Sequence, residues 1–315
     1  MRQALDNRAL KIPALLAGLL LPLCLQAETQ TTTKDWMKID TAPRQEASGV
    51  SYESKADYSY VGGASFAQGK REIGTVDEQT SSFNFVASIP ATKNLRWRLG
   101  IDWERFSFGT PGNSHLPNTL QSLAFVVGAD VSLSDKWIMR MELQPGLYSD
   151  FEDISAEDFS AQAVIGASYL VNSKLQWVFG VGLGFYQEIP AFPAVGVRWQ
   201  FADDWTLNAI LPKPRLEYKI MNGLNAYAGA ELKGGGYRVS KDFGSANGDG
   251  RFNSAVVEYM ELRTGVGISY QILPALTAEL EGGYVPYRRE DFYRLHTHEI
   301  GQPAPYVQAG LKASF

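Results

Sequence analysis

Long stretches of this sequence alternate between apolar and polar residues with a period of two. Residues 94–104, 136–144, 174–185 and 260–272 all show it. In the first of these, one row consists of Leu95, Trp97, Leu99, Ile101 and Trp103. The other row carries arginine and acidic residues. A period of two is the pattern of a β-strand whose two faces meet different surroundings. Glycine recurs in most of these windows, which disfavours a helix.

The length of the alternating windows favours a membrane barrel over a secreted β-sandwich, which is the alternative. Strands of soluble proteins usually have about five or six residues, and these windows are longer. The polar row also carries Arg, Glu and Gly along its full length. An outer-membrane barrel explains both features, because its apolar row faces lipid and its polar row faces the lumen. We therefore predict an all-β, single-chain, antiparallel transmembrane β-barrel.

Short polar turns and longer polar connections alternate along the chain. The short turns lie near residues 90, 134, 172, 203, 222 and 274. Short periplasmic turns and long extracellular loops are typical of bacterial outer-membrane barrels. The pattern predicts fourteen strands, with twelve as the alternative because Pro212 and Pro214 interrupt one hairpin. The expected strands cover about residues 57–67, 80–89, 94–106, 119–133, 136–148, 159–171, 174–187, 194–202, 204–211, 214–221, 224–239, 255–272, 275–287 and 303–315.

The first residues have the pattern of a cleavable signal peptide. Basic residues precede an apolar run that ends near Ala27, and this order is typical of secretory signals. Cys24, the single cysteine, raises the alternative of a lipoprotein signal, but the large Leu23 before it disfavours that processing. We predict a signal peptide at residues 1–27, a polar periplasmic segment at 28–55 and the barrel at 56–315. No later stretch has eighteen consecutive apolar residues, so the sequence predicts no transmembrane helix.

The chain ends on an alternating strand, YVQAGLKASF, whose last residue is Phe315. This segment resembles the terminal strand of bacterial outer-membrane proteins, whose final aromatic residue is read by the barrel-assembly machinery. The tryptophans that follow the short turns, together with LPKPRLEYKI and AGAELKGGGYRV, resemble an uncharacterised family of bacterial outer-membrane barrels. The resemblance implies location in the outer membrane, contact with its lipids and Phe315 as an assembly signal. An aromatic girdle is expected where the barrel meets the membrane interface, formed by Trp97, Trp137, Trp177, Trp205 and Phe315.

The alternation also assigns a set of charged residues to the lumen, since a Lys or Arg facing lipid costs about 2–4 kcal/mol at the midplane. These residues are Arg96, Arg98, Asp102, Glu104, Asp130, Arg140, Glu142, Arg198, Arg215, Glu217, Lys219, Glu231, Lys233, Glu261, Arg263, Glu279, Glu281 and Lys312. Such a lumen favours a passive channel or transporter for small hydrophilic solutes. A closed structural barrel or surface receptor is the alternative, because paired charges also stiffen a wall.

A lipid-modifying barrel enzyme is the least favoured hypothesis. The sequence contains no GxSxG motif, which many serine hydrolases carry. His115, His296 and His298 all fall in expected loops, and two neighbouring histidines do not define a metal site. We therefore predict no catalytic residue, no metal and no cofactor. The formal net charge is −5, which disfavours a nucleic-acid partner because such partners bind basic surfaces.

Overall fold

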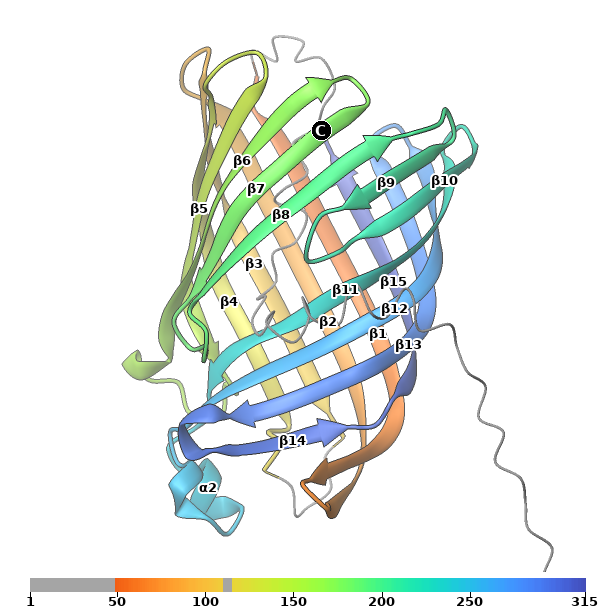
Figure 1. Cartoon of the computed structure of the whole chain (residues 1–315). Helices are drawn as coiled ribbons and strands as arrows, with labels where there is room; N and C mark the ends of the chain where they lie inside the picture. The colour runs from red at the N-terminus through yellow and green to blue at the C-terminus, as the bar shows by residue number, and fades with distance from the viewer. Residues whose placement is uncertain (1–48, 110–114) are drawn as a thin grey trace, which may run out of the picture.

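The computed structural model describes residues 49–109 and 115–315. They form one closed antiparallel barrel (Figure 1), and the predicted signal peptide lies outside the described residues. The strands are β1 (Ser51–Gln68), β2 (Arg71–Pro90), β3 (Leu95–Phe108), β4 (Thr119–Ser132), β5 (Trp137–Ser149), β6 (Phe159–Asn172), β7 (Leu175–Gly184), β8 (Ala191–Gln200), β9 (Trp205–Ala209), β10 (Arg215–Met221), β11 (Leu224–Arg238), β12 (Val256–Leu273), β13 (Leu276–Phe292), β14 (Thr297–Gly301) and β15 (Ala304–Ser314). Four short helices lie in the outer connections or at their edges: η1 (Ala156–Asp158), α2 (Phe243–Ala246), η2 (Gly250–Phe252) and η3 (Tyr293–Leu295).

The fifteen strands occupy fourteen positions in the wall, because β14 and β15 share one of them. Both pair with β13 on one side and with β1 on the other, so together they act as one interrupted strand. The pairing of β15 with β1 closes the barrel. The prediction of fourteen strands is thus confirmed over the alternative of twelve. No helix among the described residues is long and apolar enough to cross a membrane.

The two faces of each strand differ as the alternation predicts. On β3, Leu99 and Ile101 are 44% and 40% exposed, whereas Arg98 and Asp102 are 5% and 2% exposed. The apolar outer row and the buried polar row are the arrangement expected when the outside meets lipid. We call the end with the short turns and the chain terminus Phe315 the inner end. The end with α2 and the long connections is the outer end (Figure 1).

Three strands are longer than predicted. β1 begins at Ser51, so residues 51–55, expected in the polar lead-in, belong to the wall and pair with β2. β2 begins at Arg71 after a tight turn, and Gly69 in that turn has a φ of +59°, a left-handed conformation that glycine adopts without strain. β13 continues to Phe292. The outward rows of these extensions carry mostly polar residues, so alternation did not reveal them.

The wall folds in on itself at the outer end. β5 and β11 pair in parallel at Ser149 and Arg238, so the five strands from β6 to β10 are bypassed there. The inner face of β6–β8, through Val164 and Phe192, packs against Leu232 and Met260 on the outer face of β11 and β12. Near the outer end, β11 and β12 are therefore covered on their outer face by a second layer of sheet, formed by β6–β8.

An apolar core fills the inside of the barrel at the outer end. It unites inward side chains of β1–β5 and β11–β13 with Phe243 of α2 and Phe252 of η2. Phe106, Tyr237 and Tyr259 meet there as edge-to-face ring pairs. We call this cluster the outer core. It occupies the region that an open pore would leave empty.

Candidate functional site: the charged lumen

The structure places seventeen of the eighteen predicted lumen charges in buried or half-buried positions. Lys219, near the turn between β10 and β11, is exposed instead. That position lies two residues from the end of its strand. At the rim of a barrel both faces reach water, so alternation no longer separates inside from outside.

Near the inner end, two arginines are paired with carboxylates one or two strands away in the wall. Arg140 Nε lies 2.6 Å from Asp130 Oδ1, and its Nη2 donates to Oδ2 at 2.8 Å. This two-point geometry suits the planar guanidinium. Arg98 Nε lies 3.3 Å from Glu142 Oε2, and its Nη2 lies 3.5 Å from Glu53. The inner mouth thus carries charge of both signs.

A second group of charges lies on the β10–β13 side. Arg215 lies 3.4 Å from Glu279 and 3.3 Å from Glu281, and its guanidinium carbon lies 4.0 Å from the centre of the Tyr227 ring. Lys312 on β15 reaches the same Glu279 at 2.9 Å. Glu279 therefore joins two basic groups that are far apart in the sequence.

Lys213 completes this second group, although sequence alternation did not assign it. It lies in the connection between β9 and β10, and its Nζ is 2.6 Å from Glu231. That connection continues the pairing of β10 with β11, because the amide of Leu232 donates to the carbonyl of Pro212 at 2.9 Å. Lys213 has the same parity as Arg215, so extending the strand pattern through the two prolines would have found it.

Arg263 on β12 is the centre of a third group and is fully buried. It contacts Glu261 at 2.6 Å and Glu78 of β2 at 3.2 Å. Its Nη1 also donates to Ser59 at 2.7 Å and to Gln308 at 3.0 Å. One guanidinium therefore joins four strands on one side of the wall.

A further contact crosses the lumen. Lys233 of β11 lies 3.5 Å from Glu104 of β3, and their strands are three steps apart through the contact of β5 with β11. Toward the outer end from this contact, the inward row of β3 changes from Glu104 to Phe106, where the outer core begins. From the inner to the outer end, the lumen passes from charged side chains to aromatic ones.

Several buried polar groups near the outer core were missed from the sequence. Glu78 lay outside the predicted strand on β2, and Arg288 and Glu290 lay beyond the predicted end of β13. Arg288 is fully buried, with its guanidinium 4.9 Å from the centre of the Phe66 ring. Glu78 has the parity of the inward row of β2, so extending that strand would have found it. Arg288 and Glu290 have the opposite parity to Glu279 and Glu281, because the pairing of β12 with β13 shifts between Leu262 and Thr264, so extending the alternation alone would have placed them outward.

The three histidines lie in or beside β14 and in the connection between β3 and β4. His296 and His298 are exposed near η3 and on β14. His115 stacks on Phe252 with ring centres 4.2 Å apart, and its Nδ1 lies 3.7 Å from Glu299. Among the described residues no three His, Cys, Asp or Glu side chains are grouped to hold a metal.

His115 and Glu299 lie beyond the apolar band, since β13 beside them carries Arg289 and Asp291 in its outward row. Burial of the imidazole lowers the pKa of His115. Burial of the carboxyl raises the pKa of Glu299 to about 7. Both shifts favour the neutral forms of these two groups, which suits their position against an apolar core.

The predicted girdle residues lie on the outer surface at the inner end. Trp97, Trp137, Trp177 and Trp205 are 48%, 38%, 40% and 38% exposed, and Phe315 is 72% exposed. Rings that the prediction omitted extend the group, because Trp137 contacts Tyr169 at 4.8 Å and Trp205 contacts Tyr218 at the same distance. An amphipathic ring is favoured at this depth.

Three solved structures are similar to the chain at low identity. An outer membrane channel from Pseudomonas putida F1 has 9% identity and a TM-score of 0.45, over 85% of this chain and 96% of that one. The P. putida toluene transporter TodX has 9% identity and a TM-score of 0.42, over 87% and 90%. P. putida OprB has 9% identity and a TM-score of 0.37, over 91% and 99%.

No curated protein sequence matches the chain. A family model does match, over residues 50–313, which takes in nearly the whole barrel from the start of β1 to the end of β15. The chain therefore belongs to the family described as Domain of unknown function (DUF6268).

Proposed function

We propose that this barrel is a channel for small hydrophilic solutes, with its outer end closed by the outer core in the conformation described here. The observation that carries the proposal is the layered lumen. Half-buried charges such as Arg96, Arg198 and Glu217 line the inner half of the lumen. The buried Arg263 group lies closer to the outer end. Charged walls of both signs hold water and polar solutes inside a membrane.

The mixture of signs predicts weak charge selectivity. The Arg215 group and the Arg140 pair each contain opposed charges within 3.5 Å, so no ring of one sign forms at either level. Single-sign rings are the feature that makes pores strongly cation- or anion-selective. We therefore expect cationic, anionic and uncharged polar solutes all to enter the inner half of the lumen.

The second candidate is a closed structural barrel, which the outer core favours. Fifteen buried side chains fill the outer end, and the contacts of Phe106 with Tyr237 and Tyr259 leave little room there. For a solute to pass, this core has to rearrange. The two candidates therefore differ in whether the outer core moves.

Conductance in planar bilayers tests the proposal. Phe252 is 1% exposed and comes from η2, so Phe252→Ala loosens the outer core without altering a wall strand. We expect brief, infrequent openings of the wild-type protein and openings at least tenfold more frequent in Phe252→Ala. The matched control is Ile154→Ala in another outer connection, where the side chain is 54% exposed. If folded wild-type and Phe252→Ala proteins are both electrically silent, the closed structural barrel is the correct function.

A further inference from the structure

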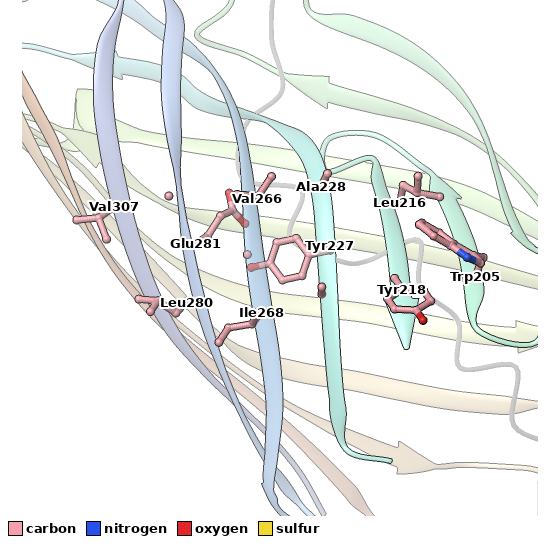
Figure 2. A pocket seen from close by; sticks show the side chains of 13 residues that line it. Trp205, Leu216, Tyr218, Tyr227, Ala228, Val266, Ile268, Leu280, Glu281 and Val307 are labelled. Carbon is pink, nitrogen blue, oxygen red and sulfur yellow. The ribbon is translucent and has the colours of Figure 1, made fainter. Parts of the chain in front are cut away.

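The outer surface of the barrel carries a hollow of about 760 Å³ on the side of β9–β13 and β15 (Figure 2). One edge of the hollow is lined by Trp205, Leu216 and Tyr218, and the opposite edge by Leu280 and Val307. The floor between the two edges includes Ala226 and Ala228. We call this hollow the lateral groove.

The register shows that the lateral groove faces outward. One row of paired residues runs around the wall as Leu216, Ala228, Val266, Gly282 and Val307. The large apolar members of this row, Val266 and Val307, are 66% and 50% exposed. They belong to the same apolar surface as Ile101 on the opposite side. The groove is therefore continuous with the surface that meets the hydrocarbon of the membrane.

The hollow follows from the sizes of the residues that line it. The floor is built from small residues, Ala226, Ala228 and Gly267, whereas the two edges carry rings and long aliphatic chains. At Gly267 a side chain on the lumen side would meet the ring of Tyr227 at 2.5 Å, so this glycine lets Tyr227 lie flat beneath the floor.

A hollow at this depth cannot stay empty or hold water. The surrounding solvent is hydrocarbon, and the exposed lining side chains are apolar except for the indole N–H of Trp205 and the hydroxyl of Tyr218 at one end. An unfilled cavity loses the dispersion contacts of its whole lining. A methylene group takes about the space of a water molecule, about 30 Å³, so the groove has room for on the order of 25 methylene groups. This is enough for one lipid acyl chain and part of a second.

We propose that the lateral groove is a binding site for the acyl chain of a phospholipid from the inner leaflet of the outer membrane. The ring pair of Trp205 and Tyr218, 4.8 Å apart, marks the inner interface at one end of the groove. From there the floor rises through Ala226 and Ala228 toward the middle of the bilayer. A chain whose headgroup lies beside these rings has its methylene groups along the small-residue floor. Recognition is of the hydrocarbon and not of the headgroup.

The test is native mass spectrometry of the full-length mature chain released from phosphatidylethanolamine nanodiscs. We expect the wild-type protein to retain one phospholipid. Ala228→Trp fills the floor with an apolar ring and should lower the retained fraction at least tenfold, and Ala226→Leu should lower it less. The matched control is Ala87→Trp on β2, in the outward row but outside the groove, which should retain the lipid as the wild type does.

The outcomes separate the occupants. Heat-modifiable gel mobility first establishes that each variant is folded. If Ala228→Trp does not fold, Ala226→Leu takes its place as the test of the groove. Equal retention from phosphatidylglycerol nanodiscs supports recognition of the acyl chain. Retention confined to one headgroup, equal retention by the folded groove variants, or a dimer that the groove variants dissociate would each overturn the proposal.

Discussion

The backbone amide of Asp150 donates a hydrogen bond of 3.2 Å to the carbonyl of Arg238, which joins the end of β5 to the end of β11 across five bypassed strands. The carboxylate of Asp150 strengthens this junction, because its Oδ2 accepts from the amide of Ser240 at 2.7 Å. The junction narrows the outer end and gives the outer core a closed wall.

The first prediction concerns this junction. Asp150→Ala removes the acceptor for the Ser240 amide, and we expect the outer end to lose about 1–3 kcal/mol of stability. Faster hydrogen exchange at the amides of Asp150 and Ser240 would report the loss. Asp153→Ala is the matched control, since its pairing with Lys241 is exposed to water and contributes little to stability. Equal exchange in the two variants would show that the junction does not depend on Asp150.

The second prediction concerns the buried Arg263 group. Arg263→Met leaves Glu78 and Glu261 buried without their shared cation, and we expect a loss of about 3–5 kcal/mol. The triple variant Arg263→Met, Glu78→Gln, Glu261→Gln removes all three charges and should recover most of that loss. Urea unfolding in lipid vesicles measures both. If the triple variant is as unstable as the single one, packing and not charge explains the role of Arg263.

The third prediction concerns the two faces of the wall. Ile101→Arg places a cation in hydrocarbon and should cost about 2–4 kcal/mol near the midplane. Ser269→Arg is the control on the lumen side, where it lies opposite Glu279, and it should cost far less. Gln176→Arg is a poorer control, because Gln176 is paired across the strands with Arg198. Folding titrations into vesicles that give equal losses for Ile101→Arg and Ser269→Arg would contradict the assigned faces.

Alternation predicted the strands and their faces well because lipid imposes one condition on every outward residue. Leu99, Ile101 and Arg98 illustrate this, since each lies on the side that its parity requires. The rule fails where lipid ends. Glu78 and Arg288 lie on parts of β2 and β13 that project into water, where outward residues are also polar and the contrast disappears.

The in-folded wall could not be predicted from the sequence. A single parallel contact between Ser149 and Arg238 has no periodicity of its own and depends on where five other strands stop. The outer core could be predicted more readily from the sequence. On β3 the inward row passes from Glu104 to Phe106 and Phe108, and this change from charge to aromatic rings marks the place where the lumen is filled.

The fourth prediction concerns pH and Glu299. Burial raises its pKa to about 7 from 4.5, so the folded protein holds a proton that the unfolded chain releases as pH rises from about 4.5 to 7. Stability is therefore lost over this range, by about 3 kcal/mol at most, and below it both states are protonated. The facing groups are Glu290, paired with Glu299 across the strands, and His115 from the connection between β3 and β4.

Glu299→Gln isolates this effect. At pH 5 the variant and the wild type should have similar free energies of unfolding, and at pH 8 the variant should be the more stable. Burial lowers the pKa of His115, so its titration destabilises the folded state as pH falls, in the opposite direction. Comparing the two proteins at each pH cancels that contribution. A stability difference that does not change between pH 5 and pH 8 would contradict a protonated Glu299.

The last prediction separates assembly from stability at Phe315. Its backbone already pairs with β1, since its amide and carbonyl each form a 3.0 Å hydrogen bond with Tyr52. Phe315→Ala keeps those bonds and removes only a ring that is 72% exposed, so refolding of the purified protein into vesicles should change by less than about 1 kcal/mol. In cells the same variant should insert several-fold less folded barrel, because the terminal ring is what the assembly machinery is expected to read. Leu311→Ala is the matched control, as it trims an outward side chain of the same strand without touching the terminus. Heat-modifiable gel mobility measures folded yield in both settings. If Phe315→Ala and Leu311→Ala lower the cellular yield equally, the terminal ring serves only as one more contact with lipid.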